Sequence, residues 1–139
     1  MRFLIVFPAL IISLSCNFNN CDADGIIIEA ALLEQAQKTG FPYCLSIQKA
    51  LKKDEIALLQ LIRFAYKTDD ATAIEHGIVF TELALKLGDD FVSNFVSKQK
   101  DEHRLLIAKM FDACMEYREP PVNLQVKLPK TLQILTNKQ

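Results

Sequence analysis

Glycine, proline and clusters of basic residues are all scarce in this chain, and each scarcity excludes a class of protein. Only four glycines and five prolines occur among 139 residues, too few for a disordered tail or a low-complexity repeat array. The formal net charge is -1 without a block of basic residues. Because nucleic-acid binders neutralise phosphates with clustered lysine and arginine, we expect no nucleic-acid partner. The 50% hydrophobic content predicts one compact domain.

Histidine is equally scarce, and its positions argue against a metal site. His76 and His103 are the two histidines, and neither has a second ligand type at the spacing of three or four residues that helical metal sites use. We therefore predict no metal and no cofactor, and we interpret both histidines as polar or core-edge residues. His103 and Cys114 share a helix, but 11 residues at about 1.5 Å each separate them by about 16 Å.

Sequence motifs of catalysis are also missing, so we predict that the protein is not an enzyme. Beyond residue 15 the serines are Ser46, Ser93 and Ser97, and none lies in a GxSxG motif or a glycine-rich phosphate loop. An enzyme whose site is assembled from distant residues stays open as an alternative. Such a site requires a pocket where His76 or His103 meets a carboxylate.

The N-terminus has the pattern of an export signal. Arg2 precedes an apolar run over residues 3–12, and small residues then lead to Cys16. The run is little more than half of the roughly 20 apolar residues that a membrane span needs, and it contains Pro8. We therefore predict a signal peptide over residues 1–15; the alternative is a buried N-terminal helix.

Cys16 leaves two ways of processing open. Leu14-Ser15-Cys16 resembles the end of a bacterial lipoprotein signal, which implies that Cys16 is acylated and becomes the new N-terminus. The resemblance also implies a periplasmic or outer-membrane-anchored protein of a Gram-negative bacterium. The small residues before Cys16 equally fit ordinary signal cleavage without a lipid. In both cases residues 16–24, which are polar, are predicted to form a tether.

Three further cysteines, Cys21, Cys44 and Cys114, predict a disulfide in an oxidising compartment. If Cys16 carries lipid, at most one disulfide can form; if not, four cysteines allow two disulfides in three connectivities. We predict a bond between Cys44 and Cys114, because both lie in predicted helices whereas Cys21 lies in the tether. Closing this loop of about 70 residues would stabilise the fold by about 4 kcal/mol. The alternative is that both are small buried hydrophobic residues.

Apolar residues recur at helical spacing through residues 25–119, which we predict to be one all-α domain. The expected architecture is a compact bundle or a short superhelical stack of about five to six helices. The pattern and the capping signals, such as Asp54 and Gly40, predict helices over about 25–39, 43–53, 56–66, 71–87, 91–99 and 101–119.

Residues 56–88 are predicted to form the heart of the core as two helices joined by a tight turn. The first helix has a broad apolar stripe that begins at Ile56, so we expect it to be largely buried. Gly77, in the second helix, would let a neighbouring backbone approach closely. The helix over residues 101–119 is expected to pack against this hairpin.

Two acidic pairs, Asp69-Asp70 and Asp89-Asp90, follow helix ends. Aspartates at such junctions favour capping of the next helix, and Thr72 with Glu75 has the spacing of a capping box. The functional alternative is that the four aspartates form an acidic rim at one end of the helical stack. Such a rim would meet a basic partner surface.

Residues 120–139 change pattern and are predicted to form an extended tail. Val122, Leu124, Val126 and Leu128 alternate with polar residues, and Pro129 interrupts them. This alternation is typical of an edge strand. An apolar tail of this kind would have to pack on the helices or on a partner.

An export signal without a catalytic motif favours a recognition protein. We expect the partner to be another envelope or secreted protein, with membrane contact through the lipid anchor. In size, export signal and helical content the chain resembles the small periplasmic immunity proteins, which neutralise cell-wall-degrading effectors. The alternative is a structural or assembly lipoprotein of the envelope. The sequence assigns no oligomeric state.

Overall fold

A computed structural model describes residues 21–137, and these residues form an all-helical fold. Within them no strand occurs, so the predicted all-α class is confirmed. The elements are α1 (Ala30–Lys38), α2 (Tyr43–Leu51), α3 (Glu55–Phe64), η1 (Ala65–Lys67, a 3-10 turn), α4 (Asp70–Leu87), α5 (Asp89–Ser97), α6 (Asp101–Tyr117), α7 (Leu124–Lys127) and α8 (Pro129–Thr136).

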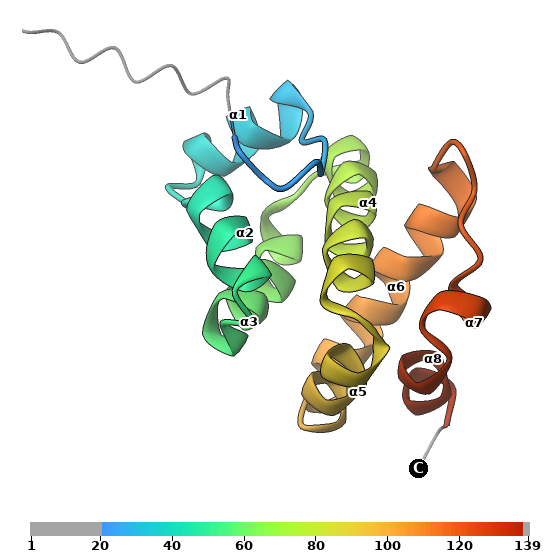
Figure 1. Ribbon diagram of the computed structural model, residues 1–139. Helices are drawn as coiled ribbons and strands as arrows, with labels where there is room; N and C mark the ends of the chain where they lie inside the picture. Colours follow the sequence, from blue (N-terminus) through green and yellow to red (C-terminus); the bar gives the residue numbers. More distant parts are fainter. Residues whose placement is uncertain (1–20, 138–139) are drawn as a thin grey trace, which may run out of the picture.

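The long helix α4 lies in the middle of the fold (Figure 1). Helices α1 and α2 contact it on one side, and α6 makes the most extensive contact with it. Helix α3 pairs with α2, while α8 packs on α5 at the other side of the molecule. The packing of α6 on α4 confirms the expectation for residues 101–119.

Local signals set the ends of several helices where the sequence predicted them. The Asp54 carboxylate accepts hydrogen bonds from the amides of Ile56, at 2.9 Å, and Ala57, at 3.1 Å, so it caps α3 as expected. Gly40 follows α1 with φ +69°, a left-handed conformation that glycine adopts without a steric penalty.

Aromatic side chains form the part of the core between α2, α3 and α4. Phe64 is 1% exposed and stacks on Phe41 with 4.6 Å between ring centroids, while Tyr43 meets it edge to face at 5.3 Å. Complete burial of one such side chain stabilises a fold by about 1.5 to 3 kcal/mol. Aliphatic residues extend this core through helices α1 to α6; fully buried examples are Leu32, Ile47, Leu61, Ile62, Leu83, Val96 and Ile107.

Gly77 is a point of close approach between α4 and α6. A β-carbon at this position would lie 2.9 Å from the backbone oxygen of Met110 and 3.1 Å from the β-carbon of Ala113. No side chain larger than hydrogen fits at these distances. The predicted role of Gly77 in close helix packing is therefore confirmed.

The pairing and the orientation of α3 differ from the sequence expectation. Helix α3 packs mainly on α2, and α4 mainly on α6, so residues 56–88 are not a closed two-helix hairpin. Ile56, expected in the buried stripe, is 71% exposed, whereas Leu58 and Leu61 are buried. The sequence stripe was broad enough to fit two helix orientations, and contact with α2 selects the one that turns Ile56 outward.

The extended C-terminal tail is a second expectation that the structure contradicts. Residues 124–127 and 129–136 are helical. The side chain of Asn123 caps α7 by accepting a bond from the amide of Val126, and Pro129 occupies the first turn of α8, a position where proline is favoured. Thus Pro129, interpreted as an interruption of a strand, instead begins a helix.

Candidate functional site

The disulfide joins Cys21 to Cys44, with 5.6 Å between their α-carbons. The predicted Cys44–Cys114 bond is therefore wrong: Cys114 is free and buried. The reason lies in the supposed tether, which from residue 21 onward belongs to the domain. Ala23 is 2% exposed, and the Gln48 side chain donates a hydrogen bond to the backbone oxygen of Asp22. These contacts hold Cys21 beside α2.

The predicted signal peptide, residues 1–15, and the lipidation site Cys16 lie outside the described residues 21–137. Both stay predictions. In the described part of the chain, no helix is long and apolar enough to cross a membrane.

His76 is not the surface-polar or core-edge residue that the sequence suggested, because it is 1% exposed. Its ring joins three helices. Nε2 lies 2.9 Å from the backbone oxygen of Leu61 in α3, and Nδ1 lies 2.7 Å from the hydroxyl of Tyr43 in α2. A carbonyl can only accept, so Nε2 carries the proton and Nδ1 accepts from Tyr43. Burial lowers the pKa of His76 to about 4, and the ring is neutral.

Neither histidine makes a hydrogen bond with a carboxylate among the described residues. Both partners of the His76 ring are neutral groups, and the pKa of His103 is lowered, first by burial and then by Lys100 and Arg63. Burial also raises the pKa of Glu75, with further contributions from nearby acidic groups. Within residues 21–137 no group of three potential metal ligands occurs.

The four aspartates do not form a single acidic rim. Asp69 and Asp70 stand at the first turn of α4, whereas Asp89 and Asp90 follow its last residue. An α-helix of 18 residues is about 27 Å long, so the two pairs lie at opposite ends of it. The helix predicted over residues 71–87 lies between the two pairs, so their separation could have been recognised from the sequence.

The two pairs also have different structural roles. Asp69 forms the capping box of α4 with Thr72, three residues before the predicted Thr72–Glu75 box, which is therefore wrong. Asp89 does not cap its own helix; its carboxylate accepts bonds from the amides of Lys130 and Thr131, each at 2.9 Å, at the start of α8. Partial burial alone would raise the pKa of Asp89, but these hydrogen bonds outweigh it and leave the pKa below its ordinary value.

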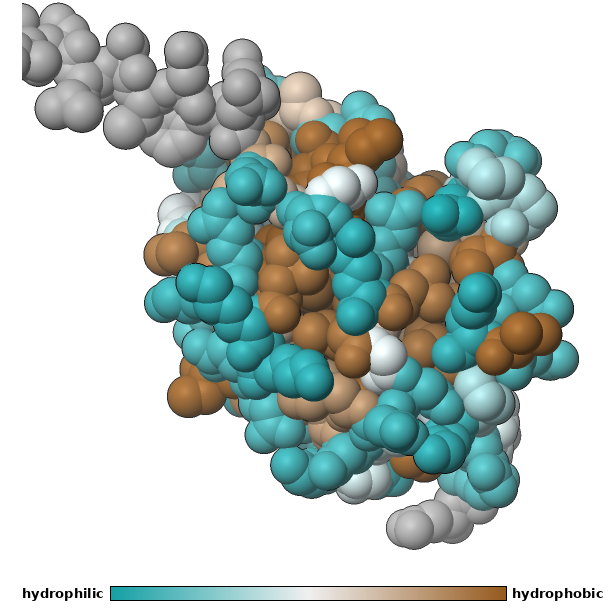
Figure 2. Space-filling view, in the orientation of Figure 1, coloured by the Kyte–Doolittle hydropathy of each residue, from teal (hydrophilic) through white to brown (hydrophobic). Residues whose placement is uncertain are grey.

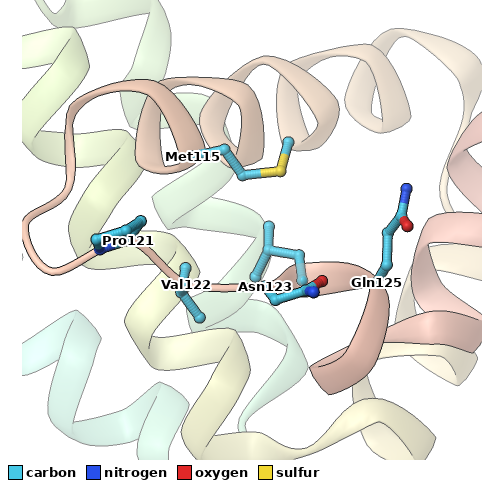
Figure 3. A pocket seen from close by; sticks show the side chains of 6 residues that line it. Met115, Pro121, Val122, Asn123 and Gln125 are labelled. Carbon is cyan, nitrogen blue, oxygen red and sulfur yellow. The ribbon is translucent and has the colours of Figure 1, made fainter.

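The strongest candidate for a binding surface lies where α6 meets the C-terminal segment. A hollow of about 380 Å³ lies between Met115 and residues 121–125, and Figure 3 shows Met115 above Val122 and Asn123. A second hollow, of about 570 Å³, continues between α6 and α8. Both include Met115 and Gln125, so we call them together the Met115 surface; its other apolar members are Val122, Leu132 and Leu135.

A separate apolar depression lies between α1 and α2 and has a volume of about 620 Å³. We call it the α1–α2 groove. Apolar and small residues line most of it, and Glu34 and Gln37 are polar exceptions; the apolar set includes Ala30, Leu33, Ala36, Phe41, Pro42 and Leu45. Figure 2 shows apolar side chains reaching the surface between polar ones on the face drawn in Figure 1. Sequence reasoning found neither surface, because each combines residues from separate helices.

The described residues thus form a small all-helical fold with two apolar depressions on its surface. Comparison with protein families, with curated proteins and with solved structures finds no match to this chain.

Proposed function

We propose that this protein is exported, is anchored by a lipid on Cys16, and binds another protein of the bacterial envelope through the Met115 surface. The proposed partner is an envelope protein or a secreted effector. The proposed mechanism is recognition without chemistry, in which apolar side chains of the partner fill the two hollows beside Met115.

The single observation that carries the binding proposal is the exposed Met115 side chain between two adjoining hollows. Met115 is 42% exposed although it belongs to a core helix. Methionine is enriched at protein interfaces because its flexible, polarisable side chain adapts to the partner. Tyr117, another residue type enriched at interfaces, is 52% exposed on the same helix.

The disulfide supports export. A bond between Cys21 and Cys44 is stable in an oxidising compartment such as the periplasm and rare in the bacterial cytosol. Its position also fits the signal-peptide prediction, since it starts five residues after Cys16. Among the described residues, the disulfide-bonded Cys21 thus lies close in sequence to the predicted processing site.

Capture of partners from native envelopes, after cross-linking, tests the binding proposal. The exported protein carries either Met115→Asp or the control Ile56→Asp; Ile56 is also exposed and apolar but lies on α3. A charge placed in the hollows should reduce partner recovery at least tenfold, or about 1.4 kcal/mol, whereas the control should recover the partner normally.

Equal recovery by both variants would contradict the assignment of the Met115 surface. The identity of the captured protein then separates the possible forms of the function. A cell-wall hydrolase would make the protein an immunity protein, whereas a component of envelope assembly would favour the structural lipoprotein.

A further inference from the structure

The disulfide fixes the place where the N-terminal segment joins the domain. Cys44 lines the α1–α2 groove, and it is bonded to Cys21. Five residues lead from Cys16 to Cys21, and five residues span at most about 18 Å when fully extended. A lipid on Cys16 therefore keeps Cys21 within about 18 Å of the bilayer surface, and the α-carbon of the groove residue Cys44 lies 5.6 Å from that of Cys21.

The same edge of the domain exposes apolar side chains. Leu45, a member of the groove, is 50% exposed. Ile27 is 76% exposed and precedes the groove residue Ala30 by three positions. Apolar side chains held this near to a bilayer gain free energy by entering the boundary between headgroups and acyl chains.

We propose that the α1–α2 groove faces the bilayer and that Leu45 and Ile27 dock on its surface. This inference rests on the lipid anchor at Cys16 in the proposed function. Helices α1–α2 and α7–α8 lie on opposite sides of α4 (Figure 1). Docking in this orientation directs the Met115 surface away from the membrane, toward a partner in the aqueous space.

Electrostatics makes the proposed contact selective among lipids. The segment that reaches the groove contains more acidic than basic side chains: Asp22, Asp24, Glu29 and Glu34 against Lys38. Lys86 neutralises part of this charge through an ion pair with Asp24 at 3.7 Å. An anionic surface repels the remainder, so the contact depends on apolar insertion and is stronger on zwitterionic lipids.

Site-directed fluorescence tests the docking. The lipidated protein is labelled with an environment-sensitive fluorophore at Leu45→Cys, at Ile27→Cys or, as control, at Val126→Cys, which is 70% exposed on α7. Cys114 is buried and Cys21 and Cys44 are bonded, so the introduced thiol is the reactive one. The labelled protein is bound to phosphatidylcholine vesicles that contain no other protein and carry quenchers on their acyl chains. Fluorescence at positions 45 and 27 should be quenched at least threefold more than fluorescence at position 126. Added phosphatidylglycerol should reduce this difference.

The outcomes separate the inference from the proposed function. Equal quenching at all three positions, with the lipid on Cys16 confirmed by mass, would overturn the docking but leave the anchor intact. Protection of position 45 in native envelopes but not in protein-free vesicles would assign the groove to a protein and equally overturn it. If Cys16 carries no lipid, as intact mass would show, the proposed anchor fails and the docking that rests on it fails with it.

Discussion

His76 connects three helices through the two nitrogens of one ring. Tyr43 in α2 donates to Nδ1, and Nε2 donates to the backbone of Leu61 in α3. Because the ring is buried, both bonds must be made for the side chain to be tolerated there. The role of His76 is to hold α2 and α3 against α4, and only its neutral form can make both bonds.

The first prediction follows from the lowered pKa of His76. The pKa is about 4 in the fold against 6.5 for an ordinary histidine, so the unfolded chain takes up the proton first as the pH falls. The contribution to stability is complete above pH 6.5 and is lost between pH 6.5 and 4, by about 3 kcal/mol. Urea unfolding at pH 7 and pH 4.5 measures this loss.

Two variants isolate the contribution of His76. His76→Gln should be less stable at pH 7 but should lose clearly less stability than the native protein on acidification. His103→Gln should keep most of the acid sensitivity, although the lowered pKa of His103 acts in the same direction. An unchanged loss in the His76 variant would show that other groups cause the acid sensitivity.

The burial of His76 could have been predicted from its own helix. Residues four apart lie on the same helix face, and both Thr72 and Phe80 are buried on α4. Phe80 was a visible signal of that face in the sequence. The partners Tyr43 and Leu61 were not, because nothing in the sequence specifies which helices α4 meets.

At the scale of whole elements, α8 depends on a carboxylate from another helix. Asp89 accepts bonds from two amides of its first turn and from the Thr131 hydroxyl, which lies 2.8 Å away. The first amides of a helix have no partner within the helix. Asp89 of α5 thus replaces the side-chain cap that α8 lacks at Leu128.

Replacement of Asp89 is therefore expected to release α8. Asp89→Ala should lower the free energy of unfolding by about 1 to 2 kcal/mol and should speed amide exchange in residues 129–136. The adjacent Asp90→Ala removes only an exposed ion pair with Lys130, and such pairs contribute at most about 1 kcal/mol. Faster exchange in the Asp90 variant alone would reverse the assignment.

Helix ends were more predictable than helix partners, for a physical reason. Asp54 and Gly40 act on their own or adjacent residues, so their effect can be inferred from local sequence. Helix α8 could not be inferred from local sequence in this way. Its cap, Asp89, lies 40 residues before Pro129, and Pro129 fits both a strand end and a first helical turn. The exposed position of Ile56 likewise depends on contact with α2.

For the molecule as a whole, the disulfide fastens the N-terminal segment to the helical domain. Cys21 and Cys44 are 23 residues apart, and closing a loop of this size stabilises a fold by about 3 kcal/mol in the chain-entropy model. We expect reduction to lower the melting temperature of the native protein. The matched variant Cys114→Ala should show the same decrease, whereas Cys21→Ser should show none. Insensitivity of Cys114→Ala to reductant would restore the original Cys44–Cys114 pairing.

The sequence predicted the fold class better than the candidate binding surfaces. The all-α class follows from the apolar periodicity, which each helix carries within itself. The Met115 surface requires α6, α7 and α8 to meet. Surfaces formed by several helices depend on the packing of the whole chain.

The proposed function and the membrane orientation both depend on the proposed export and lipid anchor, and intact-mass analysis of non-reduced protein extracted from native membranes tests these most directly. We predict a chain that begins at Cys16 and carries a diacyl or triacyl adduct there. Digestion without reductant should then yield a peptide pair linked through Cys21 and Cys44. A chain with unmodified Cys16, or one that begins after Cys16, would contradict the anchor, and reduced thiols at Cys21 and Cys44 would contradict the disulfide.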